Sequence, residues 1–144
     1  MNPFRTFAAV TLCLLALLCV GVAAAPFGGP TGTLSVSGNV DTNGGSVHVT
    51  VHDLTFANWP YYTIVGLSAI NVGFGNYVMV PAPDLIYART CDGDGADHYS
   101  APFPVGLPAG THLYMQCWQN TSVETPLDPP HWEGTNAIEI VVQP

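Results

Sequence analysis

The chain has 144 residues, of which 48% are hydrophobic and 8% are charged, with 2 Lys and Arg against 10 Asp and Glu and a formal net charge of −8. It contains no lysine, and its two arginines are Arg5 and Arg89. A chain with so few cations cannot build the basic surface that phosphate backbones and anionic membranes require. We therefore expect no nucleic acid partner and no lysine-based chemistry.

The first 25 residues have the pattern of a secretory signal peptide. Arg5 precedes an apolar run over residues 7–22, which is shorter than the ~20 residues of a comfortable membrane span, and small residues follow it. We predict a helical signal peptide over residues 1–25, with cleavage near Ala24 and Ala25. The mature protein is then secreted, either extracellular or periplasmic, and has no integral membrane span. A retained amino-terminal anchor is the alternative.

Residues 26–144 keep all ten acids and Arg89 alone, so their charge is 1 − 10 = −9, which we interpret as a solubility device. Val47, Val49 and Val51 alternate with polar residues, as in a half-buried strand. Similar runs cover residues 34–36, 61–67, 77–80, 85–91, 98–101, 112–119 and 137–142. With 13 Pro, 15 Gly and no helical period after the leader, the pattern predicts one all-β domain. We expect a two-sheet antiparallel sandwich of immunoglobulin-like architecture with seven or eight strands.

Five segments carry a resemblance to known proteins. They are Gly-Gly-Ser-Val-His-Val-Thr-Val (44–51), Val-Gly-Leu-Ser (65–68), Pro-Ala-Pro-Asp-Leu (81–85), Leu-Pro-Ala-Gly-Thr-His-Leu-Tyr-Met-Gln-Cys-Trp (107–118) and Thr-Asn-Ala-Ile-Glu-Ile-Val-Val (135–142). Together they resemble small exported immunoglobulin-like β-sandwich proteins of environmental bacteria, which are largely uncharacterised. The resemblance covers most of the mature chain. It implies an exported domain without an assigned activity and carries over no catalytic residue.

Two of the four cysteines, Cys13 and Cys19, leave with the leader, and Cys91 and Cys117 remain. In an exported protein an even pair of cysteines predicts one disulfide, so we expect Cys91 to be bonded to Cys117. The alternative is a pair of metal thiolates. No histidine lies at close ligand spacing to either cysteine, which disfavours that alternative.

Three carboxylates, Asp92, Asp94 and Asp97, fall within six positions of a glycine-containing loop. Calcium prefers such hard oxygen ligands, and these three residues are our candidate metal site. The segment lacks the glycine and the final glutamate of an EF-hand, so we favour a β-turn without a cofactor, and weak calcium binding in the same turn is the alternative. The five histidines show neither the spacing of a blue-copper site nor that of a dismutase, and we expect them to face solvent or form hydrogen bonds.

Aromatic residues supply the third candidate site. Trp59 and Trp132 both neighbour prolines in probable loops, and exposed aromatic faces beside polar groups can stack on sugars. We therefore nominate Trp59, Trp132 and the adjacent His131 as ligand-binding residues. For the aromatic residues as a group we favour packing in the core or at its rim, and ligand binding by these three residues is the alternative. For Trp118 the alternation over residues 112–119 does not choose between an inward and an outward face.

No nucleophile elbow, phosphate-binding glycine loop or paired-carboxylate signature is present, so we expect no enzymatic activity. The sequence favours a non-catalytic protein with a structural, adhesive or assembly role at the cell exterior, assembling through exposed sheet edges. Two alternatives remain open: a carbohydrate-binding module that uses exposed aromatics, and a weak calcium- or transition-metal-binding protein. The partners that these roles imply are other extracellular proteins, glycans and further copies of the chain.

Overall fold

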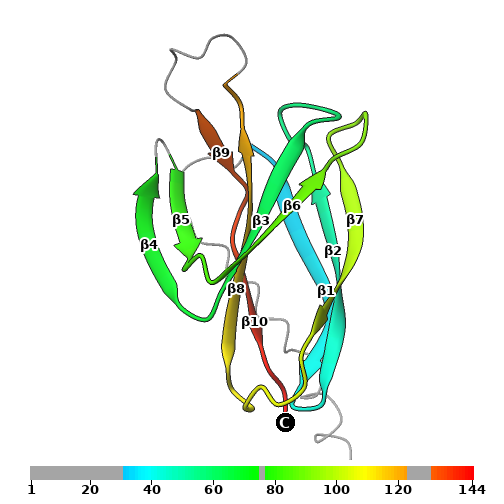
Figure 1. Cartoon of the computed structure of the whole chain (residues 1–144), viewed down its shortest axis with the longest axis vertical. Coiled ribbons are helices and arrows are strands. Elements are labelled where there is room, and N and C mark those ends of the chain that lie inside the picture. Colours follow the sequence, from blue (N-terminus) through cyan, green and yellow to red (C-terminus); the bar gives the residue numbers. More distant parts are fainter. Residues whose placement is uncertain (1–30, 75–76, 123–130) are drawn as a thin grey trace, which may run out of the picture.

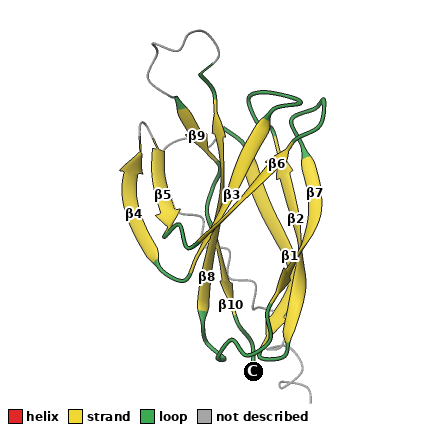
Figure 2. Ribbon diagram, viewed as in Figure 1, coloured by secondary structure: helices red, strands yellow, loops and turns green. Residues whose placement is uncertain are grey.

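The computed structural model describes residues 31–74, 77–122 and 131–144, and these are all-β, with no helix among them (Figure 2). The strands are β1 (Thr33–Asp41), β2 (Gly44–His52), β3 (Pro60–Gly66), β4 (Ala69–Phe74), β5 (Tyr77–Pro81), β6 (Leu85–Thr90), β7 (Asp97–Phe103), β8 (His112–Asn120), β9 (Trp132–Gly134) and β10 (Ile138–Val141). The predicted signal peptide, residues 1–25, lies outside the described residues. In the described part of the chain, no helix is long and apolar enough to cross a membrane.

Two antiparallel sheets face each other across the core (Figure 1). The first has the order β1–β2–β7, and the second has the order β10–β8–β3–β6, with β9 also paired to β8. The predicted alternation of β2 is confirmed, because Val47, Val49 and Val51 are all buried and belong to the core. From the second sheet the core receives Tyr61, Val65, Leu113, Met115, Cys117 and Ile138. Burial of this apolar surface is the main stabilising term of the sandwich.

A hairpin of β4 and β5 adds a third layer on the outer face of the second sheet, on the side away from β1, β2 and β7 (Figure 1). Gln116 on β8 ties it down: its side-chain oxygen accepts a hydrogen bond from Val80 N at 3.0 Å, and its amide nitrogen donates to Val78 O at 3.1 Å. The same nitrogen donates to Thr135 O at 2.9 Å. A buried amide with all these partners stabilises one position of the hairpin over β8.

The β4–β5 hairpin covers the outer face of β8. Leu113, Met115 and Cys117 point into the core between the two sheets, whereas Gln116 and Trp118 point to the outer face. Trp118 is nevertheless only 1% exposed, because Phe74 and Tyr77 of the hairpin pack against its ring. Residues 115–119 of β8 are therefore buried on both faces of the strand, although the outer face carries the polar Gln116 beside Trp118.

The prediction of an all-β antiparallel sandwich is confirmed, and each of the eight predicted runs overlaps a strand. The described residues contain ten strands rather than seven or eight. The two additional strands are β4 and β9. Strand β4 has an irregular register between Ala69 and Val72, with Asn71 at φ 51°, and β9 has only 3 residues.

Candidate ligand-binding site

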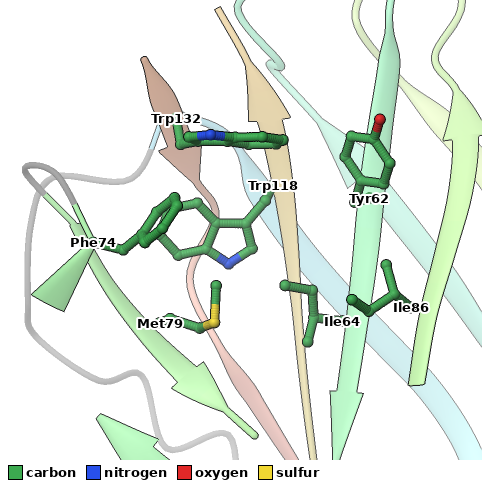
Figure 3. A pocket seen from close by; sticks show the side chains of 7 residues that line it. All are labelled: Tyr62, Ile64, Phe74, Met79, Ile86, Trp118 and Trp132. Carbon is green, nitrogen blue, oxygen red and sulfur yellow. The ribbon is translucent and has the colours of Figure 1, made fainter. Parts of the chain in front are cut away.

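The outer face of the second sheet carries an apolar groove with a volume of about 270 Å³ (Figure 3). We call it the aromatic groove. The residues that line it come from six strands and are Tyr62, Ile64, Phe74, Met79, Ile86, Trp118 and Trp132. The volume is close to the lower end of the ~300–1,000 Å³ that ligand pockets occupy.

Strand register places the floor of the groove. Ile64 on β3 lies directly opposite Ile86 on β6, and Tyr62 on β3 lies directly opposite Trp118 on β8. Because side chains alternate along a strand, Tyr62 and Ile64 share the outer face, while Tyr61 before them points into the core. These cross-strand pairs are the local reason why four apolar side chains gather at one place.

The hairpin and β9 form the walls. Phe74 meets the ring of Trp118 edge-on, with centroids 5.5 Å apart and planes at 89°. Trp132 on β9 lies 5.7 Å from Tyr62 and 6.2 Å from Phe74, both in tilted geometry. Such edge-to-face and tilted contacts are favoured arrangements of aromatic rings. Together they hold the walls in defined orientations.

A glycine allows β9 to approach this closely. Gly134 pairs with Trp118 in the sheet, and a Cβ atom at Gly134 would lie 3.0 Å from Cζ2 of the indole. With a side chain at this position, the Trp118 ring would have to shift by a few tenths of an ångström, so glycine fits best here. The Trp118 indole therefore contacts Gly134, and it also meets the rings of Phe74 and Tyr77 in edge-to-face geometry.

One buried polar atom of a residue that lines the groove lacks a hydrogen-bond partner. In the described residues, Trp118 Nε1 is the buried side-chain nitrogen or oxygen atom without a hydrogen bond. Figure 3 shows this nitrogen on the side of the indole that faces Met79 and Ile64. The lining contains no carboxylate, imidazole, thiol or ammonium group. The arrangement suits recognition of an apolar molecule and offers no acid–base pair.

The aromatic residues that the sequence predicted as a binding site lie in different places in the structure. Trp132 lines the aromatic groove, whereas Trp59 is 41% exposed, packs against Phe56 at 6.1 Å and is not part of the lining. His131 precedes Trp132 but is exposed, and its backbone nitrogen donates to Ser122 Oγ at 2.6 Å. The structure thus brings one of the three nominated residues into a site.

The other lining residues carry a weaker sequence signal. Tyr62 and Trp118 stand out as aromatic residues, yet Ile64, Met79 and Ile86 look like ordinary strand residues. Only the return of the β4–β5 hairpin over β8 assembles them. A search for apolar residues on the outer positions of neighbouring strands would have found Ile64 and Ile86.

The three aspartates of the loop have different surroundings. Asp92 Oδ1 accepts hydrogen bonds from the backbone nitrogens of Asp94 and Ala96, each at 2.9 Å, which is the geometry of a capped turn. These bonds lower the pKa of Asp92. Asp97 points away to Arg89 and Tyr61. No group of three or more His, Cys, Asp or Glu side chains in the described ranges is placed to hold a metal ion, and calcium binding stays a prediction.

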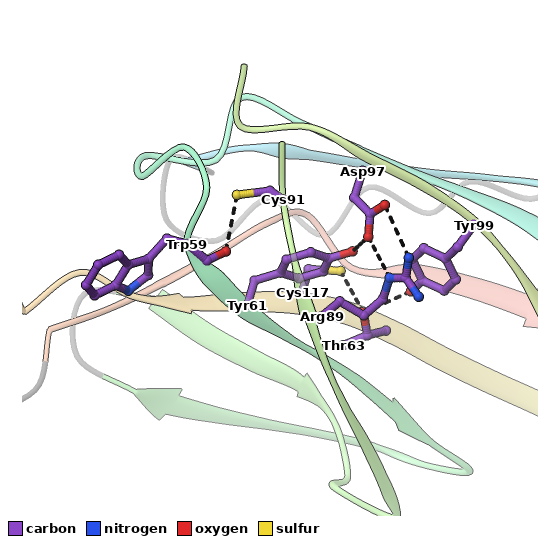
Figure 4. Close-up of polar contacts among 8 residues, drawn as sticks. All are labelled: Trp59, Tyr61, Thr63, Arg89, Cys91, Asp97, Tyr99 and Cys117. Carbon is purple, nitrogen blue, oxygen red and sulfur yellow. Dashed lines mark hydrogen bonds and ion pairs between the residues drawn. The ribbon is translucent and has the colours of Figure 1, made fainter. Parts of the chain in front are cut away.

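A polar cluster around Asp97 closes one open side of the sandwich (Figure 4). Asp97 Oδ2 accepts from Arg89 Nε at 2.5 Å and from the Tyr61 hydroxyl at 2.7 Å, and Arg89 lies 4.0 Å over the Tyr99 ring. Burial alone would raise the pKa of Asp97, but the bonds from Arg89 and Tyr61 outweigh it and lower that pKa. Burial also raises the pKa of Tyr61, and it raises that of Tyr99 to about 12. The cluster is a structural ion pair whose groups already satisfy one another.

The structure corrects the predicted disulfide, because Cys91 and Cys117 are free, buried thiols. Cys91 Sγ donates to Phe56 O at 3.1 Å, and Cys117 Sγ lies 3.4 Å from Thr63 Oγ1. Cys91 follows β6 and Cys117 belongs to β8, and these strands flank β3 on opposite sides. Cys91 N bonds to Trp59 O, whereas Cys117 pairs with Thr63, four positions further along. Strand spacing and rise then separate their Cα atoms by roughly 15 Å, far beyond disulfide reach.

Four of the five histidines have a side-chain hydrogen bond or a ring contact in the described residues, and His52 meets the ring of His98. His48 bonds to Ser100 at 3.1 Å and His98 bonds to Thr50 at 3.2 Å. His112 bonds to Glu139 at 2.6 Å, and this contact lowers the pKa of that carboxyl. These placements agree with the expectation of hydrogen-bonding histidines on the surface of the strands.

Comparisons with known proteins add one distant structural likeness. No family model matches the chain, and no curated protein matches it in sequence. A crystal structure of a DUF3823 family protein from Bacteroides uniformis is similar with a TM-score of 0.43 and 14% identity, over 80% of this chain and 57% of that one. The chain thus spans little more than half the length of that protein. A likeness at this level carries no argument about function.

Proposed function

We propose that this chain is an exported, non-catalytic binding module that recognises an apolar ligand in the aromatic groove. The groove itself carries the proposal, because about 270 Å³ of apolar space is left open at the surface. An apolar pocket lined by several aromatic side chains is the default candidate for a ligand-binding site. The signal-peptide pattern of residues 1–25 supports export, and a charge of −9 after its removal favours an uncharged or cationic ligand over an anion.

Exposure of the rim supports the same proposal. Ile86 is 54% exposed and Phe74 is 39% exposed, although both belong to an apolar cluster. Ile70 and Val72 on β4 continue the exposed apolar surface, at 41% and 51%. Contiguous apolar surface on a soluble domain marks a place of interaction.

A sugar fits the groove less well than an apolar ligand does. Sugars need hydrogen-bonding partners beside the stacking ring, and the lining contains no carboxylate or amide. The nearest candidate by sequence, Glu133, already accepts a hydrogen bond from Thr55. Carbohydrate binding through exposed aromatics is therefore the secondary proposal, and a glycan array distinguishes it.

The test uses Nile red, a neutral apolar dye whose emission rises when it leaves water. We expect the purified protein to bind it, and Trp132→Ala to weaken the binding by about tenfold or more, as truncation of a central aromatic does. Trp59→Ala is the matched control, because Trp59 has similar chemistry but lies outside the lining. Absence of dye binding, or equal loss in both variants, would contradict the proposal.

A second proposed role is assembly through the edge of β6, which forms one end of the second sheet. Leu85, Ile86 and Tyr87 are 46%, 54% and 44% exposed, and β6 contains neither proline nor lysine to block edge pairing. Sedimentation at high concentration tests this. We expect oligomers that Tyr87→Lys disrupts, and a monomer at every concentration would exclude assembly by this edge.

A further inference from the structure

We infer that the aromatic groove receives an aromatic side chain from an extended peptide segment, and that this segment pairs as a strand with the free edge of β6. The inference rests on the proposed binding function and names the class of its ligand. It begins from two open apolar spaces on opposite faces of β6. One is the aromatic groove on the outer face of the second sheet, and the other is a smaller gap between the two sheets, which we call the inner gap.

The sandwich is open along β6 and closed on its opposite side. On the closed side, Gln143, which follows β10, donates from its backbone nitrogen to Val40 O on β1 at 2.8 Å and forms a β-bridge with Asp41. Strands β6 and β7 are the edges of their sheets on the open side, where the Arg89–Asp97 ion pair crosses between them. Among the described strands, none pairs with the free edge of β6. That edge can therefore accept another strand.

Strand β6 is better suited than β7 to accept it. Pro102 in β7 has no N–H group to donate, whereas β6 contains neither proline nor lysine. Leu85, Ile86 and Tyr87 are consecutive and exposed, and because consecutive side chains point to opposite faces, β6 is apolar on both. A strand laid along this edge would remove apolar surface and unpaired backbone groups from water together.

The backbone of β6 presents hydrogen-bonding groups at the free edge. Cys91 N donates to Trp59 O at 3.2 Å, one position beyond the last pair of the β3–β6 ladder. In an antiparallel ladder the bonds come from alternate residues, so the odd-numbered residues of β6 bond to β3. The even-numbered Ile86 and Ala88 then direct their N–H and C=O groups away from β3. Unpaired groups of this kind are the template for strand addition.

Register places a residue of an added strand beside the aromatic groove. Ile86 lines the groove from β6, opposite Ile64 on β3 (Figure 3). A residue opposite Ile86 on the added strand would point to the same outer face, and an aromatic side chain can reach facing and diagonal neighbours. The groove holds about 270 Å³, is lined by four aromatic side chains and exposes no polar atom. It therefore suits an aromatic ring rather than a polar side chain.

The inner gap holds about 60 Å³ and lies between the two sheets. Leu85 and Tyr87 line it from β6, Met115 lines it from β8, and Ala101 lines it from β7. On an added strand, the residues before and after the aromatic one would point to this inner face, because side chains alternate. A space of this size takes a small aliphatic side chain such as that of valine. The segment thus has an aromatic residue between two small aliphatic residues.

Charge sets a further property of the segment. Residues 26–144 carry a charge of −9, and their single cation apart from histidines, Arg89, is already paired with Asp97. Repulsion disfavours an acidic peptide, whereas a neutral or basic one is attracted. A second copy of the chain would bring the same negative charge, and the large side chain that its β6 could place over the groove is Ile86 rather than an aromatic ring. A foreign segment without net negative charge is therefore the favoured occupant.

The test uses the peptide acetyl-Lys-Thr-Val-Phe-Val-Thr-Lys-amide. We expect it to bind the purified protein, to displace Nile red from the aromatic groove, and to slow hydrogen exchange at the amides of Ile86 and Ala88. The same peptide with alanine in place of phenylalanine should bind about tenfold or more weakly, because the central aromatic anchor is lost. Equal binding of these two peptides, or binding without displacement of Nile red, overturns the inference.

Two backbone-modified peptides separate strand pairing from nonspecific apolar contact. One carries N-methyl groups on the phenylalanine and both threonines, and the other carries them on both valines. Because N–H groups alternate between the two edges of a strand, one set of methyl groups would face β6 and the other would face solvent. We expect one of these peptides to lose detectable binding and the other to bind like the unmodified peptide. Equal affinities of the two would contradict strand addition.

Ala88→Pro tests the edge from the side of the protein. This variant removes one N–H group from the free edge and leaves every lining residue of the aromatic groove unaltered. We expect it to lose the peptide and to keep Nile red, and retained dye binding shows that the variant is folded. Ala88→Val is the matched control, because it keeps the N–H group and should keep the peptide.

The outcomes separate the inference from the proposed function. Nile red binding without peptide binding overturns the inference and leaves the binding function standing. Oligomers that Ala88→Pro disperses and that the peptide does not disperse would assign the edge to a second copy, which also overturns the inference. If Nile red itself fails to bind, the proposed function fails, and the inference fails with it.

Discussion

Arg89 on β6 and Asp97 on β7 form an ion pair, with Nε 2.5 Å from Oδ2, between the edge strands of two different sheets. Arg89 is the single cation of residues 26–144, apart from histidines. The chain has ten acidic residues, and the one that pairs with Arg89 is Asp97. This ion pair joins the edge of the second sheet to the edge of the first. The Tyr61 hydroxyl completes the arrangement from the core side.

Loss of this ion pair should lower stability. We expect Asp97→Asn to reduce the free energy of unfolding by about 1–2 kcal/mol, since the bonds to Asp97 are charge-assisted but the Arg89 side chain is 35% exposed and solvent screens it. Urea unfolding at neutral pH measures the change. The control is Asp94→Asn, in the exposed part of the same loop, which should alter stability little.

The difference should depend on pH. The folded pKa of Asp97 is lowered, so its contribution is present above its unfolded pKa of about 3.9 and is lost as the pH falls through the folded value. The gap between the protein and Asp97→Asn should therefore narrow below about pH 4. A gap that stays constant from pH 7 to pH 2 would mean that the carboxylate charge contributes nothing.

The sandwich could be predicted from sequence because its inward positions alternate cleanly, as Val47, Val49 and Val51 do on β2. Strand β4 could not, since Asn71 in a left-handed conformation and Gly73 interrupt its alternation. The sequence also did not show which side of β8 faces the core. Both of its faces are buried around Gln116 and Trp118, because one packs in the core and the other lies under the hairpin.

The aromatic groove depends on contacts that no local pattern encodes. Gln116 reaches Val80 across 36 residues of sequence, and this bond fixes the hairpin that forms one wall. For Cys91 and Cys117, in contrast, the sequence predicted a bond that the structure does not contain. Their number and compartment favoured a disulfide, and only the strand register shows that β3 lies between them.

Both cysteines should be present as thiols in the native protein. Burial raises the pKa of Cys117 to about 12, although the Thr63 hydroxyl partly opposes this, so almost no thiolate exists at neutral pH. We expect slow reaction with a thiol reagent in the folded state. After unfolding in denaturant without reductant, peptide mapping should show adducts on both Cys91 and Cys117, and recovery of a peptide that links the two residues would refute the assignment.

A methyl group at Gly134 should damage the aromatic groove. Its Cβ would lie 3.0–3.2 Å from three carbons of the Trp118 indole, so we expect Gly134→Ala to cost about 1–3 kcal/mol and to weaken Nile red binding. Gly73→Ala is the control in the neighbouring hairpin, because its Cβ would meet nothing within 4 Å. Equal melting temperatures for the two variants would show that Trp118 has room to move.

Replacement of Gln116 should release the hairpin while the sandwich stays folded. Gln116→Leu leaves Val80 N, Val78 O and Thr135 O without the amide that bonds to them, and Gln116 is only 3% exposed. We expect a loss of about 2–4 kcal/mol. Hydrogen exchange should rise in β5 more than in β2, which lies in the other sheet.

The control for this variant is Gln143→Leu, whose amide bonds only to the exposed Val141 O among the described contacts. That substitution should leave exchange in β5 unchanged. Because Phe74 and Met79 of the hairpin form part of the aromatic groove, Gln116→Leu should also weaken Nile red binding without altering any lining residue. Unchanged exchange in β5 together with unchanged dye affinity would show that apolar packing on Trp118 alone holds the hairpin in place.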